Sequence, residues 1–429
     1  MICNNCISHN NKYAISYNSF KLYVAIILFF PTLWGILGSS AISLGQLFYT
    51  FAVLISGLLL IPNSIENLKF PRPYAILFSF ITLSYAATLS INSIIDNGSL
   101  SFNDFTDVYR PISYFLSLYI GSALFRNPLS FGKIRFIIVI VLACAVFDIV
   151  KFSNLGAVIL KLYTHLDRHT FNYMRFSGTF AYCYNYCYIL LFALLCSLFC
   201  NINKKLFVSI SLILIALTGS RSGLLAVCCT LILYNILEHT PIKAFKYFCY
   251  AIIIAVLAVI ILISLNIPLV NDIIANIEKL LAAFSGTGDD GSLSTRNSQL
   301  DRVLANFKEN PLWGRGPLKS VSAPIEIQLG YYLSSWGIVG TSLYLSLIGF
   351  SLYIAFYCKN HPGFIGKFSK ANCIWILCSF IMGMSTPITD QIRVSQFFFL
   401  IQGLQWHIYS TEKGKRNLQY RNNNDNKNT

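Results

Sequence analysis

The sequence predicts an all-α polytopic membrane protein of about twelve transmembrane helices, and three observations lead to that class. Hydrophobic residues make up 55% of the 429 positions, whereas charged residues make up only 11%. Mean hydropathy is +0.60. A soluble domain carries about 25% charged residues. The third observation is the number of long apolar runs, because a helix needs about 20 mostly apolar residues to cross a membrane.

Twelve predicted spans divide the chain into four parts. Residues 1–265 hold nine spans with short loops, 266–325 form a large loop with a short helix, 326–410 hold three further spans, and 411–429 form a disordered basic tail. The fourth and seventh spans are short for a membrane crossing. The spans are predicted at residues 22–38, 41–61, 74–95, 111–125, 134–151, 178–200, 206–219, 222–237, 247–265, 326–357, 371–388 and 393–410.

Lysine and arginine set the orientation of these spans, because cytoplasmic loops are enriched in them. With both termini in the cytoplasm, every short inner loop is basic, as at Lys204 with Lys205 and at Lys367 with Lys370. The large loop between the ninth and tenth spans then lies on the outer side. We therefore predict a multi-pass inner-membrane protein with two cytoplasmic termini.

The segments placed outside are rich in arginine. The planar guanidinium fork grips phosphate or carboxylate through two parallel hydrogen bonds. This indicates an anionic ligand on the outer side. The outer arginines are Arg110, Arg168, Arg175, Arg221, Arg296, Arg302, Arg315 and Arg393.

Other readings of the composition are excluded. The net charge of +15 does not indicate a nucleic-acid-binding protein, because the cations lie in short loops between apolar runs. The 13 cysteines lie mostly inside apolar runs, so no disulfide framework is implied. Cys3 and Cys6 stand near His9, and His165 and His169 are four residues apart. Neither group supplies the three or four ligands that zinc needs, so no metal site is predicted.

The large outer loop contains a flexible stretch, a helix and a turn. Ser285 to Ser292 is rich in glycine and aspartate and is expected to be flexible. A helix is predicted from Thr295 to about Lys308, and Asn310-Pro311 ends it. Gly314 and Gly316 bracket a turn that is expected to expose Arg315. The helix face predicted to pack onto the membrane domain consists of Leu300, Val303, Leu304 and Phe307.

The most specific local motif is Thr218-Gly-Ser-Arg-Ser222, which joins two apolar runs. It places Arg221 at the outer membrane boundary and at the start of a helix, where free N–H groups favour an anion. Ser220 and Ser222 add hydroxyl donors. The alternative is an interfacial arginine that extends towards lipid headgroups.

Two further sets of arginines are candidate ligands of the same anion. Arg175 precedes Gly178 and Asn185, and its alternative role is to anchor a span. Arg296 and Arg302 lie on the loop helix and Arg315 in the turn. Arg302 is expected to point away from the apolar face, and solvated surface charge is the alternative for this set.

Glu326 stands where the large loop re-enters the membrane. A carboxylate at that depth needs a partner, and the outer arginines are candidates. Glu326 is predicted either as a general base or acceptor-sugar ligand, or as one half of a structural ion pair.

Taken in order, these motifs resemble the superfamily of bacterial O-antigen ligases and O-antigen polymerases. The resemblance rests on Arg175 with Gly178 and Asn185, on Thr218–Ser222, on Arg296 with Asn310–Gly316, and on Glu326 followed by Gly337 and Gly340. It covers roughly residues 170–345 in detail. It implies a glycosyltransferase without metal or other cofactor, acting at the periplasmic face on an undecaprenyl-diphosphate-linked oligosaccharide.

One departure separates the branches of that superfamily. Ligases of the family carry a His-Asn pair where this chain has Glu326-Ile327. The resemblance therefore favours a polymerase, which joins lipid-linked repeat units of a surface polysaccharide such as O-antigen. Glu326 and Arg221 would be catalytic, and Arg175, Arg296, Arg302, Arg315, Ser220 and Ser222 would bind the diphosphate and sugar. Membrane lipids, a chain-length regulator and a flippase are the implied partners.

Two alternatives to a polymerase stay open from the sequence. One is a ligase-type transfer of the glycan to lipid A–core or to another acceptor. The other is a lipid-linked oligosaccharide flippase or transporter. A transporter would show two related halves and charges at mid-membrane, and we find neither in the sequence.

Overall fold

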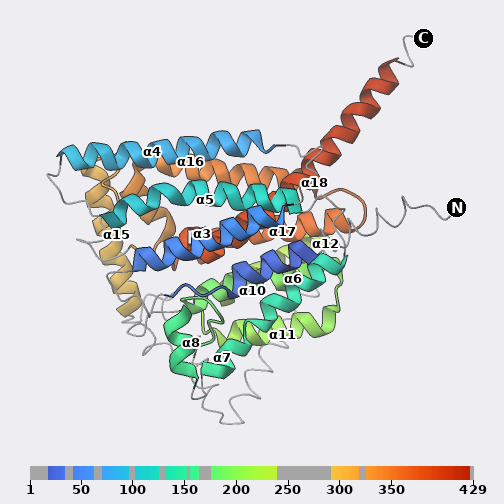
Figure 1. The fold of residues 1–429 in the computed structure, drawn as a ribbon, viewed down its shortest axis with the longest axis horizontal. Helices are drawn as coiled ribbons and strands as arrows, with labels where there is room; N and C mark the ends of the chain where they lie inside the picture. The colour runs from blue at the N-terminus through green and yellow to red at the C-terminus, as the bar shows by residue number, and fades with distance from the viewer. Residues whose placement is uncertain are drawn as a thin grey trace.

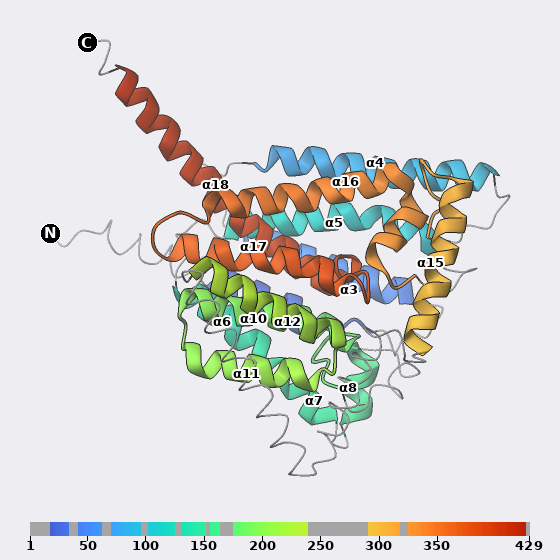
Figure 2. The same cartoon turned by 180° about the vertical axis from the view of Figure 1, so that it is seen from behind.

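The computed structural model describes residues 18–33, 42–61, 70–95, 102–124, 131–151, 155–163, 175–238, 291–317 and 325–425. The regular elements in these ranges are helices, most of which run side by side along one axis (Figures 1 and 2). The predicted ninth span, 247–265, lies outside the described residues. The first helix is Asn18–Phe29, followed by α3 Ile42–Leu60, α4 Arg72–Ile95, α5 Phe102–Leu124, α6 Phe131–Ala143, α7 Val146–Lys151, α8 Gly156–Tyr163, α10 Cys183–Cys200, α11 Lys204–Leu217, α12 Arg221–Glu238, α15 Gly291–Glu309, α16 Gln328–Cys358, α17 Phe364–Met382, the 3₁₀ helix η2 Ile388–Asp390, and α18 Ile392–Asp425.

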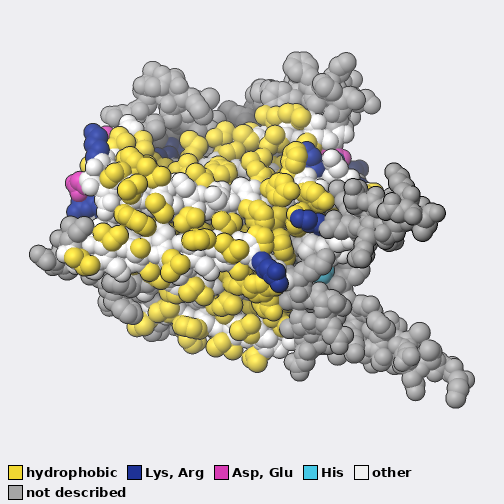
Figure 3. Space-filling view, turned by 90° about the horizontal axis from the view of Figure 1, so that it is seen from above, with side chains coloured by type: hydrophobic (Ala, Val, Ile, Leu, Met, Phe, Trp, Pro, Cys, Tyr) yellow, Lys and Arg dark blue, Asp and Glu magenta, His cyan; other side chains and the backbone are white. Residues whose placement is uncertain are grey.

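The helices have the length and surface of membrane-embedded elements. Five of those described, α4, α10, α12, α16 and α17, are long and apolar enough to cross a membrane. Large hydrophobic side chains stand exposed along α4, among them Ile76, Phe80 and Leu83. Figure 3 shows a broad hydrophobic face with lysine and arginine towards its two ends. Such a face suits lipid, so the protein is a polytopic membrane protein, whereas the count of twelve spans stays a prediction.

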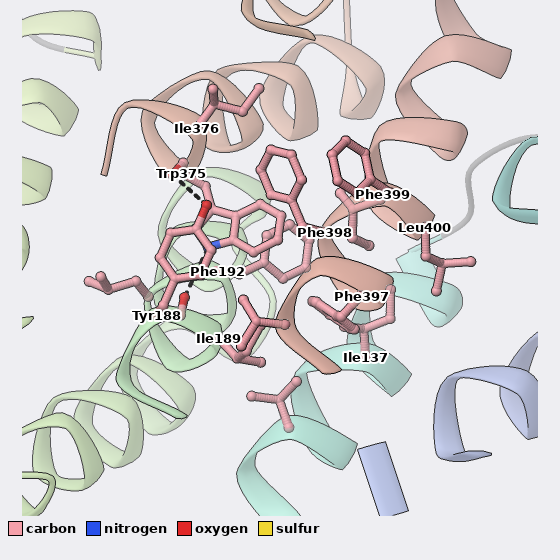
Figure 4. Close-up of a cluster of buried hydrophobic side chains, with 14 of the residues drawn as sticks. Ile137, Tyr188, Ile189, Phe192, Trp375, Ile376, Phe397, Phe398, Phe399 and Leu400 are labelled. Carbon is pink, nitrogen blue, oxygen red and sulfur yellow. Dashed lines mark hydrogen bonds between the residues drawn. The ribbon is translucent and has the colours of Figure 1, made fainter. Parts of the chain in front are cut away.

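The interior is organised around α10, nearly all of whose side chains are buried. Tyr188 of α10 and Trp375 of α17 each donate a hydrogen bond to the other's backbone carbonyl oxygen, at 3.2 and 2.9 Å. Figure 4 shows this pair beside Phe192 and Phe397. Reciprocal bonding satisfies both polar groups within an aromatic cluster, so α10 and α17 are fixed in register.

Helices α5 and α18 approach each other closely through glycine. A side chain at Gly121 would clash with the backbone of α18, and one at Gly403 would clash with the backbone of α5. Small residues at such contacts let membrane helices pack closely. Because α5 packs closely on α18, the start of α5 lies next to η2. The charged residues described below lie there.

Several predicted boundaries differ from the structure. Helix α5 begins at Phe102 instead of at 111, because its acidic and basic residues are buried among neighbours and not left in a loop. The span predicted at 134–151 is two helices, α6 and α7, separated at Cys144-Ala145. The tail predicted to be disordered from 411 is helical as far as Asp425, as a continuation of α18.

The bundle has two distinct ends. Helix α15 lies across one of them, and α18 extends from the other (Figures 1 and 2). We call the first the α15 end. It gathers the starts of α5, α10, α12, α16 and α18, and the predicted site residues lie there.

Candidate active site

Helix α16 is broken at the α15 end. Gly337 has φ 61° and ψ −164°, a conformation that is essentially confined to glycine. Residues 328–336 therefore run in a different direction from the long remainder of the helix (Figure 2). The span predicted as one helix at 326–357 is kinked. A break of this kind exposes backbone groups that need partners in a membrane interior.

The turn at Asn310–Gly316 supplies those partners. The N–H groups of Arg315 and Gly316 donate to the carbonyl oxygens of Ser334 and Ser335, at 3.0 and 2.9 Å. In return, the N–H of Ile338 donates to Pro311 O at 2.9 Å, and that of Val339 to Leu312 O at 3.2 Å. The motif that the sequence marked as a turn is thus a clamp on the broken helix.

Helices α4 and α15 hold the clamp in place. Thr88 Oγ1 donates to Trp313 O at 2.9 Å, and Asn92 Nδ2 donates to Gly314 O at 3.0 Å. Asn306 Nδ2 of α15 donates to Ser334 Oγ at 2.7 Å. Arg315 forms an ion pair with Glu309, with 2.8 Å between Nη1 and Oε2. Its predicted role in substrate binding remains a prediction, and its geometry ties it to the clamp.

Arg175 and the Thr218–Ser222 turn, two separate motifs in the sequence, lie together. The N–H of Phe176 donates to Leu217 O at 3.0 Å. Gly219 has φ 59°, and an added Cβ there would stand 3.1 Å from Arg175 Nε. The arginine side chain therefore packs over the glycine of the turn. Among the described residues, no carboxylate lies within ion-pair distance of Arg175.

The serines of the turn act mainly on the turn itself. Ser220 Oγ accepts from the N–H of Gly223 at 3.1 Å and so caps the start of α12. It also lies 3.3 Å from Ser222 Oγ, and both side chains are buried. The geometry gives these hydroxyl groups a structural role, and their predicted contact with substrate is untested. Arg221, the first residue of α12, is half-buried.

Glu326 is exposed just ahead of α16. Its backbone N–H donates to Gln299 Oε1 of α15 at 3.0 Å. Its carboxylate is close enough to Tyr184, near the start of α10, to interact with it electrostatically. Within the described part of the chain, Glu326 takes part in no ion pair, so none of the outer arginines described is its structural partner.

The face of α15 that packs against the bundle differs from the predicted apolar face. Leu300 and Leu304 are 43% and 53% exposed, whereas Gln299 and Val303 are buried. Polar bonds from Gln299 to Glu326 and from Asn306 to Ser334 orient the helix, and the apolar pattern does not. The prediction for this face is wrong at Leu300 and Leu304 and right at Val303, and Phe307 is half-buried.

Arg296 and Arg302 are half-buried on α15 instead of solvated. The Nε atom of each is buried and has no hydrogen-bond partner in the described part of the chain. Buried polar groups are nearly always hydrogen-bonded, so two donors without partners on one helix are a notable feature of this end.

The sequence analysis missed a buried charge cluster at the same end. Arg110 Nη1 lies 2.6 Å from Asp390 Oδ2, and its Nε lies 3.1 Å from Asp107 Oδ1. Gln46 Oε1 accepts from Arg110 Nη2 at 3.2 Å, and Tyr331 Oη donates to Asp107 Oδ2 at 3.2 Å. The sequence pattern that could have indicated this cluster is the spacing of acidic and basic residues three apart at the start of α5. Because these residues have low hydropathy, the sequence analysis placed them in a loop.

Comparison with known families bears on about a third of the chain. Residues 206–345 match the family described as O-antigen ligase. The matched segment includes the Thr218–Ser222 turn, α15, the clamp and the kink of α16, but neither Arg175 nor Asp390. No curated protein matches the sequence. The match supports the resemblance of the chain to the superfamily of O-antigen ligases and O-antigen polymerases, whose members are glycosyltransferase-like enzymes.

Proposed function

We propose that the chain is a polysaccharide polymerase that joins undecaprenyl-diphosphate-linked repeat units at the periplasmic face of the inner membrane. The observation that carries the proposal is the packing of Arg175 over Gly219 in the turn that ends at Arg221, at the same end of the bundle as Glu326. Two arginines next to a helix start suit a diphosphate. A carboxylate without an ion-pair partner among the described residues suits a proton acceptor.

The reaction is a substitution at the anomeric carbon of the donor sugar. A hydroxyl oxygen of the acceptor sugar forms the new glycosidic bond. The bond between the anomeric carbon and the diphosphate oxygen breaks, and its electron pair leaves with undecaprenyl diphosphate. The hydroxyl proton passes to the carboxylate of Glu326. The activated diphosphate supplies the driving force, so the reaction is proposed to need no metal or nucleotide.

Each proposed residue has a defined part in that step. Arg221 and Arg175 would stabilise the negative charge that develops on the leaving diphosphate, which is the type of contribution that often dominates catalysis. Glu326 would orient and deprotonate the attacking hydroxyl group. Arg296 and Arg302, whose Nε atoms lack partners, would bind the substrate from α15. Ser220 would keep Arg221 in place by capping α12, and Ser222 would support it through its contact with Ser220 Oγ.

A ligase-type transfer is the second candidate, because the matching family is described as O-antigen ligase. The pair Glu326-Ile327, in place of the His-Asn pair expected of ligases, supports the polymerase. A flippase would use the arginines to hold the lipid but would have no need of Glu326. A chain-length regulator and a flippase are proposed as functional partners of the polymerase.

Deletion of the gene in its host separates these functions on a gel of surface polysaccharide. Loss of a polymerase leaves lipid A–core bearing a single repeat unit, which is the expected result. Loss of a ligase or of a flippase leaves no repeat unit on lipid A–core, and that result would contradict the proposal. Reporter fusions check the topology, with Glu309 expected in the periplasm and Lys205 and Lys367 in the cytoplasm.

A further inference from the structure

A small cavity lies at the α15 end, between α3, α10 and the start of α18, away from the residues assigned above. Its volume is about 40 Å³, and its walls include Gln46, Tyr49, Tyr163, Asn185 and Arg393. One water molecule needs about 10–15 Å³ on this scale. The cavity therefore has room for a small polar group, such as a carboxylate, and not for a whole sugar ring.

Arg393 brings a buried positive charge to the cavity, with only 6% of the residue exposed. Its guanidinium donates to three backbone carbonyl oxygens, those of Leu28 at 3.0 Å, Phe30 at 2.6 Å and Thr179. These bonds fix the orientation of the guanidinium, but carbonyl groups do not neutralise its charge.

Among the described residues, no carboxylate lies within ion-pair distance of Arg393. Asp148, which is also buried, accepts the N–H groups of Ser177 and Gly178 at 2.9 and 2.7 Å. Buried charges in proteins are normally paired. This contrasts with Arg110, which is paired with two aspartates. The cavity therefore presents a positive charge that an anionic ligand would neutralise.

Asn185 is the second, independent indication of a ligand. The residue is 3% exposed and lines the cavity, and its Oδ1 atom is buried without a hydrogen-bond partner among the residues that the structure describes. A buried acceptor that stays unsatisfied destabilises the folded protein. A hydroxyl group of a ligand would satisfy it.

Aromatic rings complete the site. Tyr49 and Tyr163 lie over the guanidinium of Arg393, with 5.1 and 5.2 Å from its carbon to the ring centroids. Phe180 lies at 5.8 Å. These rings cover the guanidinium of Arg393, so the cavity offers a ligand one cation and one amide acceptor, which suit a carboxylate and a hydroxyl group.

We propose that this cavity is a subsite for the polar groups of an acidic sugar residue, namely its carboxylate, which binds Arg393, and one of its hydroxyl groups, which donates to Asn185. The sugar would belong to the repeat unit, and in that respect the inference rests on the proposed function. The subsite would select repeat units that contain a uronic acid.

The test is binding of D-glucuronate, D-glucose or inorganic phosphate to the purified full chain in detergent, measured by ligand-observed NMR and by thermal stability. Glucuronate is expected to bind at least about tenfold more tightly than glucose or phosphate. Equal binding of glucose, tighter binding of phosphate, or no binding of glucuronate would each overturn the proposal.

Two variants show whether binding occurs at this site. Arg393→Gln removes three backbone contacts and can fail to fold, so Asn185→Leu is the decisive change. It should weaken glucuronate binding at least about tenfold and leave the ligand-free protein as stable as wild type or more so, because an unsatisfied acceptor is removed. The control is Asn235→Leu on α12, whose amide bonds only within its own helix. Unchanged glucuronate binding by Asn185→Leu would refute the subsite.

The failure of the two proposals can be told apart. Glucuronate binding needs no turnover. Specific binding together with a gene deletion that leaves polymer length normal would refute the polymerase and keep the subsite. If the gene deletion leaves a single repeat unit on lipid A–core but the protein does not bind glucuronate, the polymerase is supported and the subsite is refuted.

Discussion

At the α15 end of the bundle, oppositely charged groups are paired in the interior and a helix is broken, whereas at the opposite end the described ion pairs lie near the surface between regular helices. The first end holds Arg110 with Asp107 and Asp390, and the kink at Gly337. The opposite end holds partly exposed contacts, such as Lys370 with Glu238 at 2.6 Å and His361 with Glu412 at 2.9 Å. Surface pairs of this kind contribute about 0–1 kcal/mol.

The contrast indicates where function lies. Buried charges and backbone outside the common conformations cost stability, and they persist where function requires them. The opposite end needs only short loops and basic residues that fix topology. We therefore expect changes at the α15 end to have large effects, and matched changes at the opposite end to have small ones.

The sharpest separation of activity from stability is expected at Glu326. Glu326→Gln keeps the size of the side chain but removes its proton-accepting charge, so polymer formation should fall by about 10²–10⁴-fold. Protein abundance in the membrane should stay normal, because Glu326 is exposed and takes part in no described ion pair. The control is Glu309→Gln, at an exposed pair with Arg315. Polymer of normal length from Glu326→Gln would remove Glu326 from the site.

At Arg110 the effect should fall on folding. Arg110→Ala leaves Asp107 and Asp390 buried without their shared cation, which should cost about 3–5 kcal/mol. The readout is the amount of monodisperse protein extracted from membranes. Lys370→Ala breaks the Glu238 pair at the opposite end and should cost no more than about 1 kcal/mol. If Arg110→Ala and Lys370→Ala reduce the amount of monodisperse protein to a similar degree, the two ends do not differ in the way that we propose.

The two parts of α16 offer a comparison within a single helix. Gly337→Ala places a side chain at positive φ and into the backbone at Leu312, so it should cost about 3 kcal/mol or more. Gly349 lies in the regular part, and an added Cβ there meets no atom within 4 Å. Gly349→Ala should therefore cost nothing measurable, and thermal unfolding in detergent would rank the two variants. A tolerated Gly337→Ala would mean that the clamp does not need the break.

The smallest effect is expected from Arg221→Lys. The charge is kept but the bidentate fork is lost, so polymer formation should fall by about 10–100-fold, and by more in Arg221→Ala. Lys204→Arg, at the opposite end, is the matched exchange and should leave polymer length unchanged. If Arg221→Lys makes normal polymer at normal abundance, Arg221 is an interfacial anchor and the diphosphate is held elsewhere.

Hydropathy could predict the helices but not the charges inside them. Apolar runs predicted the positions of α3, α4, α10 and α12 to within a few residues. They misplaced the start of α5, because Asp104, Asp107 and Arg110 resemble loop residues until the fold surrounds them. The ion pair between Arg110 and Asp390 joins residues that are far apart in the chain, so no local sequence pattern predicts it.

Motif order singled out segments that the fold brings together, whereas their roles in a site stay predictions. Arg175 and the Thr218–Ser222 turn were singled out separately and lie together. The Asn310–Gly316 turn was also found, but its action as a clamp depends on the unusual backbone at Gly337 and could not be foreseen. The apolar face of α15 was mispredicted because polar bonds from Gln299 and Asn306 set its rotation.

The central claim is that residues at the α15 end join lipid-linked repeat units. The most direct measurement reconstitutes the purified protein with undecaprenyl-diphosphate-linked repeat units alone and reads the products on a gel. We predict a ladder of lengthened glycans from wild type, with only single repeats from Glu326→Gln at equal protein. Single repeats from wild type, with transfer only when lipid A–core is added, would contradict the claim and assign the protein as a ligase.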